Sequence, residues 1–228
     1  MAYSTSDIRN IALVGQAGAG KTLLAEGLLL EAGVTRSRGS LERGTTICDF
    51  DPQEKQLHHS LDAALVHLPA AGSHVQLFDT PGYPDFLCRA MTVLEAVETA
   101  AVVVSAVNGI EPVTQRMMDF ARDRELCRLV IINKIDSREA APERVLAQLR
   151  ETFGRECLPL NLPAQGGRAV VDCFFQPAAA SELKPDFSSV EAAHTEIIDQ
   201  VVEVDEDLMK LYLEQGEELT PEQLHDPF

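Results

Sequence analysis

The sequence is organised around residues 15–22, which read Gly-Gln-Ala-Gly-Ala-Gly-Lys-Thr. This stretch fits the pattern G-x-x-x-x-G-K-[ST], in which glycines let successive backbone N–H groups turn inward around a phosphate. The lysine adds a positive charge, and the threonine offers a hydroxyl to a Mg²⁺ ion. A dinucleotide-binding G-x-G-x-x-G pattern is excluded because position 23 is Leu23. The residues expected to bind nucleotide phosphates are Gly15, Gln16, Ala17, Gly18, Ala19, Gly20, Lys21 and Thr22.

The segments around this loop alternate between strand and helix patterns. An apolar run at 8–14 predicts a buried strand, and residues 22–32 predict a helix whose N-terminal dipole favours the same anion. Further strands are expected at 61–69, 73–78, 100–107 and 129–133, and further helices at 90–97, 111–124 and 141–153. The alternation predicts an α/β fold with three layers, a mainly parallel sheet between helices. Residues 33–60 show little periodicity and predict a long, mobile loop.

The alternation of strand and helix patterns ends near Cys157. Two short strands are expected at 158–164 and 168–175, joined by a turn at 165–167. Residues 177–185 are irregular, and two acidic helices are expected at 190–204 and 205–215. This part of the chain therefore predicts a small α+β subdomain.

Composition and charge exclude several classes of protein. The longest apolar run, 100–107, is too short to cross a bilayer, and the five cysteines include no C-x-x-C pair. Reduced thiols in a cytoplasmic protein are expected, and His58 and His59 are expected to be solvated loop residues. Residues 181–228 hold 14 acidic and 2 basic side chains within a total net charge of −17. We therefore expect no binding to DNA or membranes, since anionic surfaces repel such a chain.

A second motif, Asp79-Thr80-Pro81-Gly82, follows the strand expected at 73–78. The Asp79 carboxylate is expected to hold Mg²⁺ through water, and the Gly82 amide to approach a γ-phosphate. In a parallel sheet, ligands bind beyond the carboxyl ends of the strands. Because Gly15, Asp79, Asn108 and Asn133 all lie just past strand ends, we expect one shared crevice.

A third motif, Asn133-Lys134-Ile135-Asp136, predicts which base is bound. The Asp136 carboxylate can accept hydrogen bonds from N1–H and the N2 amino group of guanine, while Asn133 serves the opposite base edge and Lys134 covers the purine face. Adenine lacks both donors and would leave a carboxylate unpaired. An adenine-specific P-loop enzyme is therefore the less favoured interpretation.

With these three motifs in this order, the chain resembles the translational GTPases, and among them elongation factor G and its elongation-factor-G-like paralogues. The resemblance covers nearly all 228 residues, including segments at 108–114, 158–163, 170–172 and 204–214. It implies a GTP-binding domain over 1–157 and an insertion subdomain over 158–228. It also implies binding of GTP or GDP with Mg²⁺, GTP hydrolysis, and a ribosomal partner through the factor-binding site of the rRNA and the stalk protein.

The chain departs from the family pattern at three positions. Gly18 replaces an aspartate, and Ser60 aligns loosely with the threonine of the first switch, so Thr22, Ser60 and Asp79 are the expected metal-binding residues. Tyr83 stands where the family has the histidine that positions the attacking water, so Tyr83, Lys21 and Gly82 are the expected catalytic residues. No His, Gln or Arg is expected near the γ-phosphate. A guanine-nucleotide switch with negligible hydrolysis is therefore the alternative.

The resemblance also implies that the chain stops before a last strand and a closing helix of the GTP-binding domain, and within the insertion. The edge of the strand at 129–133 would then be left unpaired. We therefore expect the isolated chain to associate with itself.

Overall fold

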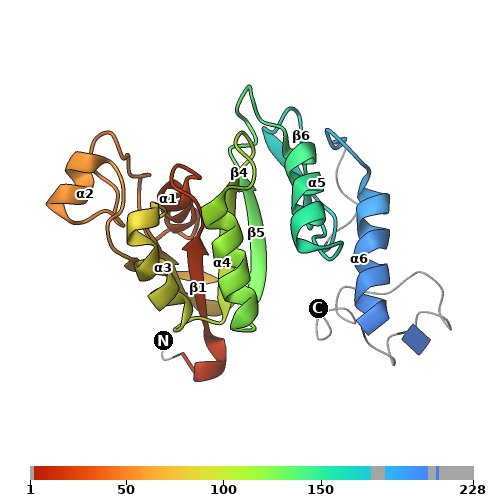
Figure 1. Ribbon diagram of the computed structural model, residues 1–228, viewed down its shortest axis with the longest axis horizontal. Coiled ribbons are helices and arrows are strands. Elements are labelled where there is room, and N and C mark those ends of the chain that lie inside the picture. The colour runs from red at the N-terminus through yellow and green to blue at the C-terminus, as the bar shows by residue number, and fades with distance from the viewer. Residues whose placement is uncertain (1–2, 176–182, 205–208, 211–228) are drawn as a thin grey trace. The chain divides into compact units, whose positions relative to one another are not determined.

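The computed structural model describes residues 3–175, 183–204 and 209–210, and the chain forms two compact units, 1–134 and 135–228 (Figure 1). The domain limits expected from the sequence, 1–157 and 158–228, remain a prediction, because compactness does not show where an insertion begins. No helix among the described residues is long and apolar enough to span a membrane.

The first unit contains a five-stranded sheet in the order β2-β3-β1-β4-β5, which confirms the predicted mainly parallel α/β architecture. Strands β3, β1, β4 and β5 are parallel, and β2 is antiparallel to β3. The bounds are β1 Ile8–Val14, β2 Ala64–Ala70, β3 Ser73–Asp79, β4 Thr99–Ser105 and β5 Cys127–Asn133. Strand β4 ends two residues before the expected limit, because the chain turns and the Gly109 N–H donates to the Ser105 carbonyl at 2.8 Å.

Helices cover both faces of this sheet, which gives the predicted three layers (Figure 1). Leu13 and Val103 pack in one buried cluster with Ala25 and Leu29 of α1 (Lys21–Glu31). Successive residues of a strand point to opposite faces of the sheet, so the residues next to Leu13 and Val103 point to the other face. That face is covered by α3 (Leu87–Leu94) and α4 (Pro112–Asp123), which contact β1 and β4. Helix α3 begins three residues before the expected limit, because a 3₁₀ turn at Pro84–Phe86 leads directly into it.

The prediction of one long loop over residues 33–60 misses a helix. The segment contains α2 (Pro52–Leu57), which begins after the capping residue Asp51. Buried carboxylates organise the remainder: Glu26 accepts from the Gly39 N–H at 3.0 Å, and Glu54 accepts from the Leu61 N–H at 2.8 Å. Hydrogen bonds of this kind leave no periodic signal in a sequence, because they join acids to backbone groups far along the chain.

The second unit contains α5 (Pro142–Phe153), the antiparallel pair β6 (Asn161–Ala164) and β7 (Ala169–Asp172), and α6 (Val190–Val204). The strand pair and α6 share a buried apolar cluster that includes Leu162, Phe174 and Ile197. The predicted small α+β arrangement is thus confirmed, with strands shorter than expected. The helix expected at 205–215 and most of the irregular segment at 177–185 lie outside the described residues.

Candidate functional site

A cleft of about 240 Å³ lies where the chain leaves the carboxyl ends of β1, β3 and β5. Its walls come from the loop after β1, the segment before β2, and the turn after β3. The lining residues are Ala17, Gly18, Gly20, Lys21, Thr22, Leu23, Leu41, His58, His59, Ser60, Thr80, Gly82, Tyr83 and Lys134. The structure therefore brings together five of the eight loop residues predicted to bind phosphate, together with Ser60, Gly82, Tyr83 and Lys134.

Two glycines of the loop are required by its shape. Gly15 has φ +125°, and a Cβ there would lie 2.5 Å from the carbonyl oxygen of Val103. Gly20 has φ +96°, and a Cβ there would lie 2.5 Å from the Asn133 Nδ2 atom. Both angles fall in the region that side chains disfavour. The loop therefore follows its path only because these two positions carry no side chain.

Lys21 is buried at the start of α1, with a relative exposure of 6%. Its Nζ donates hydrogen bonds to the carbonyl oxygens of Gly15 and Gln16, each at 2.9 Å. Burial lowers the pKa of the Lys21 ammonium from 10.5 to about 8, and the Asp79 carboxylate partly opposes this shift. The result is a poorly hydrated cation at the wall of the cleft, which a phosphate oxygen can approach.

Asp79, at the end of β3, is 1% exposed, and neither carboxylate oxygen has a hydrogen-bond partner among the described residues. Burial raises its pKa from 3.8 to about 7. The Thr22 hydroxyl and the Lys21 ammonium oppose the shift, although Thr22 lies outside hydrogen-bonding geometry. Unpaired carboxylate oxygens of this kind suit Mg²⁺, which prefers oxygen ligands and retains several waters.

The hydroxyls of Thr22 and Ser60 both line the cleft. The Oγ1 of Thr22 and the Oγ of Ser60 are 3.3 Å apart, and Ser60 also donates to the buried Asp49 carboxylate at 2.7 Å. One cation could therefore contact both hydroxyls. No group of three or more His, Cys, Asp or Glu side chains within the described part of the chain could hold a metal by itself. A cation here would depend on hydroxyls, water and phosphate oxygens.

Gln16 has a role that its position in the sequence does not reveal. Its side chain is buried and points away from the cleft, where Nε2 donates to the Gly109 carbonyl at 3.0 Å and to Glu111 at 3.2 Å. The Thr114 hydroxyl donates to its Oε1. These bonds attach the phosphate loop to the start of α4, so only the Gln16 backbone is available to a phosphate.

The Asn133-Lys134-Ile135-Asp136 motif extends across the limit between the two units. Asn133 donates from Nδ2 to the Ala19 carbonyl at 2.8 Å and so supports the phosphate loop. Lys134 is exposed, lines the cleft and has φ +61°. Asp136 is exposed and follows two residues later, in the second unit.

The turn after β3 brings a glycine and an aromatic ring to the cleft. A Cβ on Gly82 would lie 2.6 Å from the Ala17 nitrogen, so no side chain fits there. Tyr83 is 43% exposed, and its ring centroid lies 4.5 Å from that of His59. Both histidines line the cleft, which the sequence did not predict, while His58 is exposed and His59 half-buried, as expected for solvated loop residues. Their position beside Ser60 is the one signal that could have indicated this.

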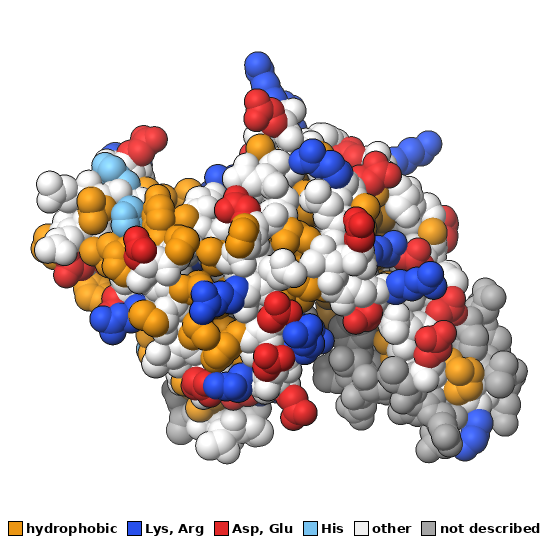
Figure 2. All heavy atoms as spheres, in the orientation of Figure 1, with side chains coloured by type: hydrophobic (Ala, Val, Ile, Leu, Met, Phe, Trp, Pro, Cys, Tyr) orange, Lys and Arg blue, Asp and Glu red, His pale blue; other side chains and the backbone are white. Residues whose placement is uncertain are grey.

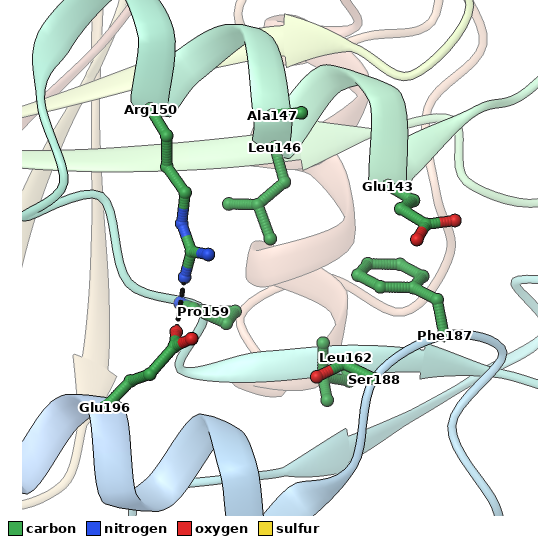
Figure 3. A pocket seen from close by; sticks show the side chains of 9 residues that line it. All are labelled: Glu143, Leu146, Ala147, Arg150, Pro159, Leu162, Phe187, Ser188 and Glu196. Atoms are coloured by element: carbon green, nitrogen blue, oxygen red, sulfur yellow. Dashed lines mark hydrogen bonds and ion pairs between the residues drawn. The ribbon is translucent and has the colours of Figure 1, made fainter.

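A second cavity, of about 290 Å³, lies within the second unit between α5, β6 and α6 (Figure 3). Its apolar wall is formed by Leu146, Leu162 and Phe187. The Arg150 guanidinium at its edge is already bound to Glu196 at 2.5 Å. Among the described residues that line this cavity, no buried side chain lacks a hydrogen-bond partner. The cavity therefore has no feature of a phosphate site.

The family model of the elongation factor Tu GTP-binding domain matches residues 6–221. The chain belongs to this family. It is similar to an elongation factor G-like protein of Mycobacterium tuberculosis, with 34% identity over 215 residues, covering 90% of this chain and 30% of that protein. An elongation factor G-like protein of Thermotoga maritima is 31% identical, covering 96% of this chain and 32% of that protein.

A solved structure shares the fold of this GTP-binding domain. A crystal structure of a Thermus thermophilus protein has a TM-score of 0.84 and 35% identity, covering 98% of this chain and 35% of that one. The chain therefore spans about a third of the length of these relatives. The resemblance to elongation-factor-G-like proteins is confirmed over about nine-tenths of the chain.

Proposed function

We propose that this GTP-binding domain hydrolyses GTP to GDP and phosphate in a Mg²⁺-dependent reaction, as part of an elongation-factor-G-like translation factor. The observation that carries the proposal is Asp79, a buried carboxylate without a hydrogen-bond partner among the described residues, in the same site as the buried cation Lys21. The two groups offset the effect of burial on each other only in part, and a nucleotide–Mg²⁺ complex supplies an opposite charge to both.

The phosphates would be held by the loop after β1. Backbone N–H groups of residues 15–20 surround them, and the Lys21 ammonium exchanges its carbonyl partners for phosphate oxygens. Thr22 and Ser60 would bind Mg²⁺ directly and Asp79 would bind it through water, which is supported by the 3.3 Å separation of the two hydroxyls. When bound, the ion would neutralise charge on the β- and γ-phosphates.

Guanine would be selected by residues 133–136. Asn133 already supports the phosphate loop through Ala19, Lys134 would cover the purine face, and Asp136 would accept hydrogen bonds from guanine N1–H and N2. Adenine would leave the carboxylate unpaired. The two-residue separation between Lys134 and Asp136 lets the same loop contact both the face and the edge of one base.

In the reaction, a water oxygen forms a bond to the γ-phosphorus while the bond from that phosphorus to the bridging oxygen of GDP breaks. Lys21 and the Gly82 amide would stabilise charge on the γ-phosphate, and Tyr83 lines the same cleft, where its phenol can contact water. Ribosomal coupling in the cytoplasm, through the rRNA factor-binding site and the stalk protein, is proposed from the elongation-factor relatives.

The base assignment is tested by Asp136→Asn. GDP affinity should fall about 100-fold, and xanthosine diphosphate should bind better than GDP, because its O2 accepts from the new amide. The exposed Asp123→Asn is the matched control and should leave both affinities unchanged. Calorimetric titration with GDP, GTP, ATP and xanthosine diphosphate measures this. ATP binding as tight as GDP binding would show that the guanine assignment is wrong.

A guanine-nucleotide switch with negligible hydrolysis is the second candidate, favoured by the tyrosine at position 83. Phosphate release from GTP, followed with and without ribosomes, separates the two functions. Saturable GTP binding with no release above the uncatalysed rate in either condition would favour the switch.

A further inference from the structure

We propose that His59 orients the water that attacks GTP, and that Tyr83 fixes the imidazole ring in position for this task. The inference rests on the proposed hydrolysis and assigns the water to a residue other than Tyr83, the candidate that the sequence offered. It follows from the location of His59, from its tautomer, and from the rings that surround it.

His59 lines the same cleft as the residues proposed to hold the γ-phosphate and Mg²⁺. It directly precedes Ser60, whose hydroxyl is 3.3 Å from that of Thr22, and both residues line the cleft with Lys21 and Gly82. A γ-phosphate held by Lys21 and the Gly82 amide would therefore share the cleft with the His59 ring. The ring is half-buried, so it is open to water on one side.

The tautomer of His59 is set by its neighbour. The Nδ1 atom lies 3.3 Å from the Ser60 carbonyl oxygen, which can only accept a hydrogen bond, so in the neutral ring Nδ1 carries the hydrogen. The Nε2 atom is then an acceptor. None of the described residues donates to it, so it can accept a hydrogen bond from water.

Two aromatic side chains hold the ring in place. Tyr83 lies 4.5 Å away between centroids at an interplanar angle of 48°, and Phe86 lies at 6.4 Å. His58, by contrast, has its Nδ1 atom 2.8 Å from the Leu41 carbonyl and is exposed. Both histidines line the cleft, but only His59 packs against aromatic rings there, whereas His58 is the residue that follows the last turn of α2.

The water so held would donate to His59 Nε2 and direct an oxygen lone pair at the γ-phosphorus. As the new P–O bond forms and the bond to GDP breaks, the water proton leaves with the phosphate product. Misplacement of a reacting group by about 1 Å can cost about 100-fold in rate. The imidazole therefore acts by position, as a hydrogen-bond acceptor.

The test compares two substitutions that separate packing from hydrogen bonding. His59→Phe retains a ring against Tyr83 but has no acceptor, whereas His59→Gln loses the ring but retains an acceptor. We expect kcat for ribosome-stimulated GTP hydrolysis to fall about 100-fold in His59→Phe and less than about 10-fold in His59→Gln. The Kd for GDP should stay within about threefold of wild type in both, a shift below about 1 kcal/mol.

His67→Phe, at an exposed position on β2, is the matched control and should match wild type. His59→Phe turning over like wild type, or His59→Gln being as slow as His59→Phe, would overturn the assignment of His59. If kcat falls in a Tyr83→Phe variant but not in either His59 variant, the Tyr83 phenol, and not His59, orients the water. If wild-type protein binds GDP but never hydrolyses GTP, the proposed function fails and the role of His59 fails with it.

Discussion

At the scale of single residues, the site is defined by two buried charges of opposite sign. Asp79 and Lys21 each lie in surroundings that disfavour their ionised form, and burial moves both pKa values toward neutrality. The Lys21 ammonium donates hydrogen bonds to two backbone carbonyls, which offset part of the cost of its burial, whereas the Asp79 carboxylate has no hydrogen-bond partner among the described residues. Burial of these two charges therefore costs the ligand-free protein stability, and a ligand that pairs with them can reduce this cost. Shifted pKa values of this kind are typical of functional sites.

This cost predicts a pH dependence for Asp79→Asn. The folded pKa of Asp79 is raised from 3.8 to about 7, so its contribution to stability is full below pH 3.8 and is lost as the pH rises through about 7. Asparagine does not titrate. Relative to wild type, the nucleotide-free variant should therefore gain about 2 kcal/mol of unfolding free energy between about pH 5 and pH 8.

Urea unfolding at both pH values, without Mg²⁺ or nucleotide, measures the change. The exposed Asp123→Asn is the control, and its difference from wild type should not vary with pH. A constant difference for Asp79→Asn as well would mean that the carboxylate is solvated in the free protein.

The glycines of the phosphate loop provide a second prediction. Gly15→Ala should destabilise the protein by about 3 kcal/mol, because the methyl group would meet the Val103 carbonyl at 2.5 Å at a backbone angle that alanine disfavours. Gly18→Ala is the matched control, since Gly18 has φ +72° but no atom within 4 Å of the place that a methyl carbon would take. It should cost about 1 kcal/mol. Equal losses in thermal or urea unfolding would show that the loop can relax around the extra methyl.

At the scale of elements, the segment between α1 and β2 is ordered by acids rather than by apolar contacts. Glu26, Asp49 and Glu54 are buried and accept hydrogen bonds from the backbone or hydroxyls of this segment. The bond from Ser60 to Asp49 is one of them. These acids therefore determine where Ser60 and His59 lie relative to Lys21.

Removal of one acid should loosen this segment. Glu54→Ala leaves the N–H groups of Asp51, Leu61 and Asp62 without their acceptor, at a cost of about 1–3 kcal/mol for an unsatisfied buried group. We expect trypsin to cleave at Arg43 about 10-fold faster than in wild type. Mass spectrometry of timed digests measures this.

Glu31→Ala, at an exposed position directly before the same segment, is the matched control and should be cleaved at the wild-type rate. Faster cleavage in both variants would point to a general effect of lost charge. Cys48 of this segment is buried in the same apolar cluster as Leu13 and Leu29. Unchanged cleavage in Glu54→Ala would show that this apolar packing holds the segment without the Glu54 carboxylate.

At the scale of the whole molecule, charge governs which partners the chain can meet. The net charge is −17, and Figure 2 shows basic side chains scattered singly among acidic ones on the visible face. A chain of this charge repels a polyanion such as RNA over a large contact area, so a contact with rRNA would be confined to a small surface. If the chain meets the ribosome as proposed, a basic protein is the favoured first contact.

The isolated chain should accordingly show no saturable binding to duplex RNA, with any Kd weaker than about 100 μM at near-physiological salt. Fluorescence anisotropy with a labelled RNA hairpin measures this, and a labelled Lys-rich peptide serves as the oppositely charged comparison. Tight RNA binding that weakens steeply with salt would reveal a basic surface that the charge balance does not predict.

The fold class and most of the loop that faces the cleft could be predicted from local signals along the chain. The apolar runs of β1 and β4, the glycines at 15 and 20, and the Lys21-Thr22 pair are such signals, because each reflects the conformation of its own segment. Only the folded chain shows that Gln16 is bound to Gly109, that Asp79 is buried without a partner among the described residues, and that His59 lies against Tyr83. These contacts depend on which distant side chains meet in three dimensions, whereas periodicity specifies only which face of an element is buried.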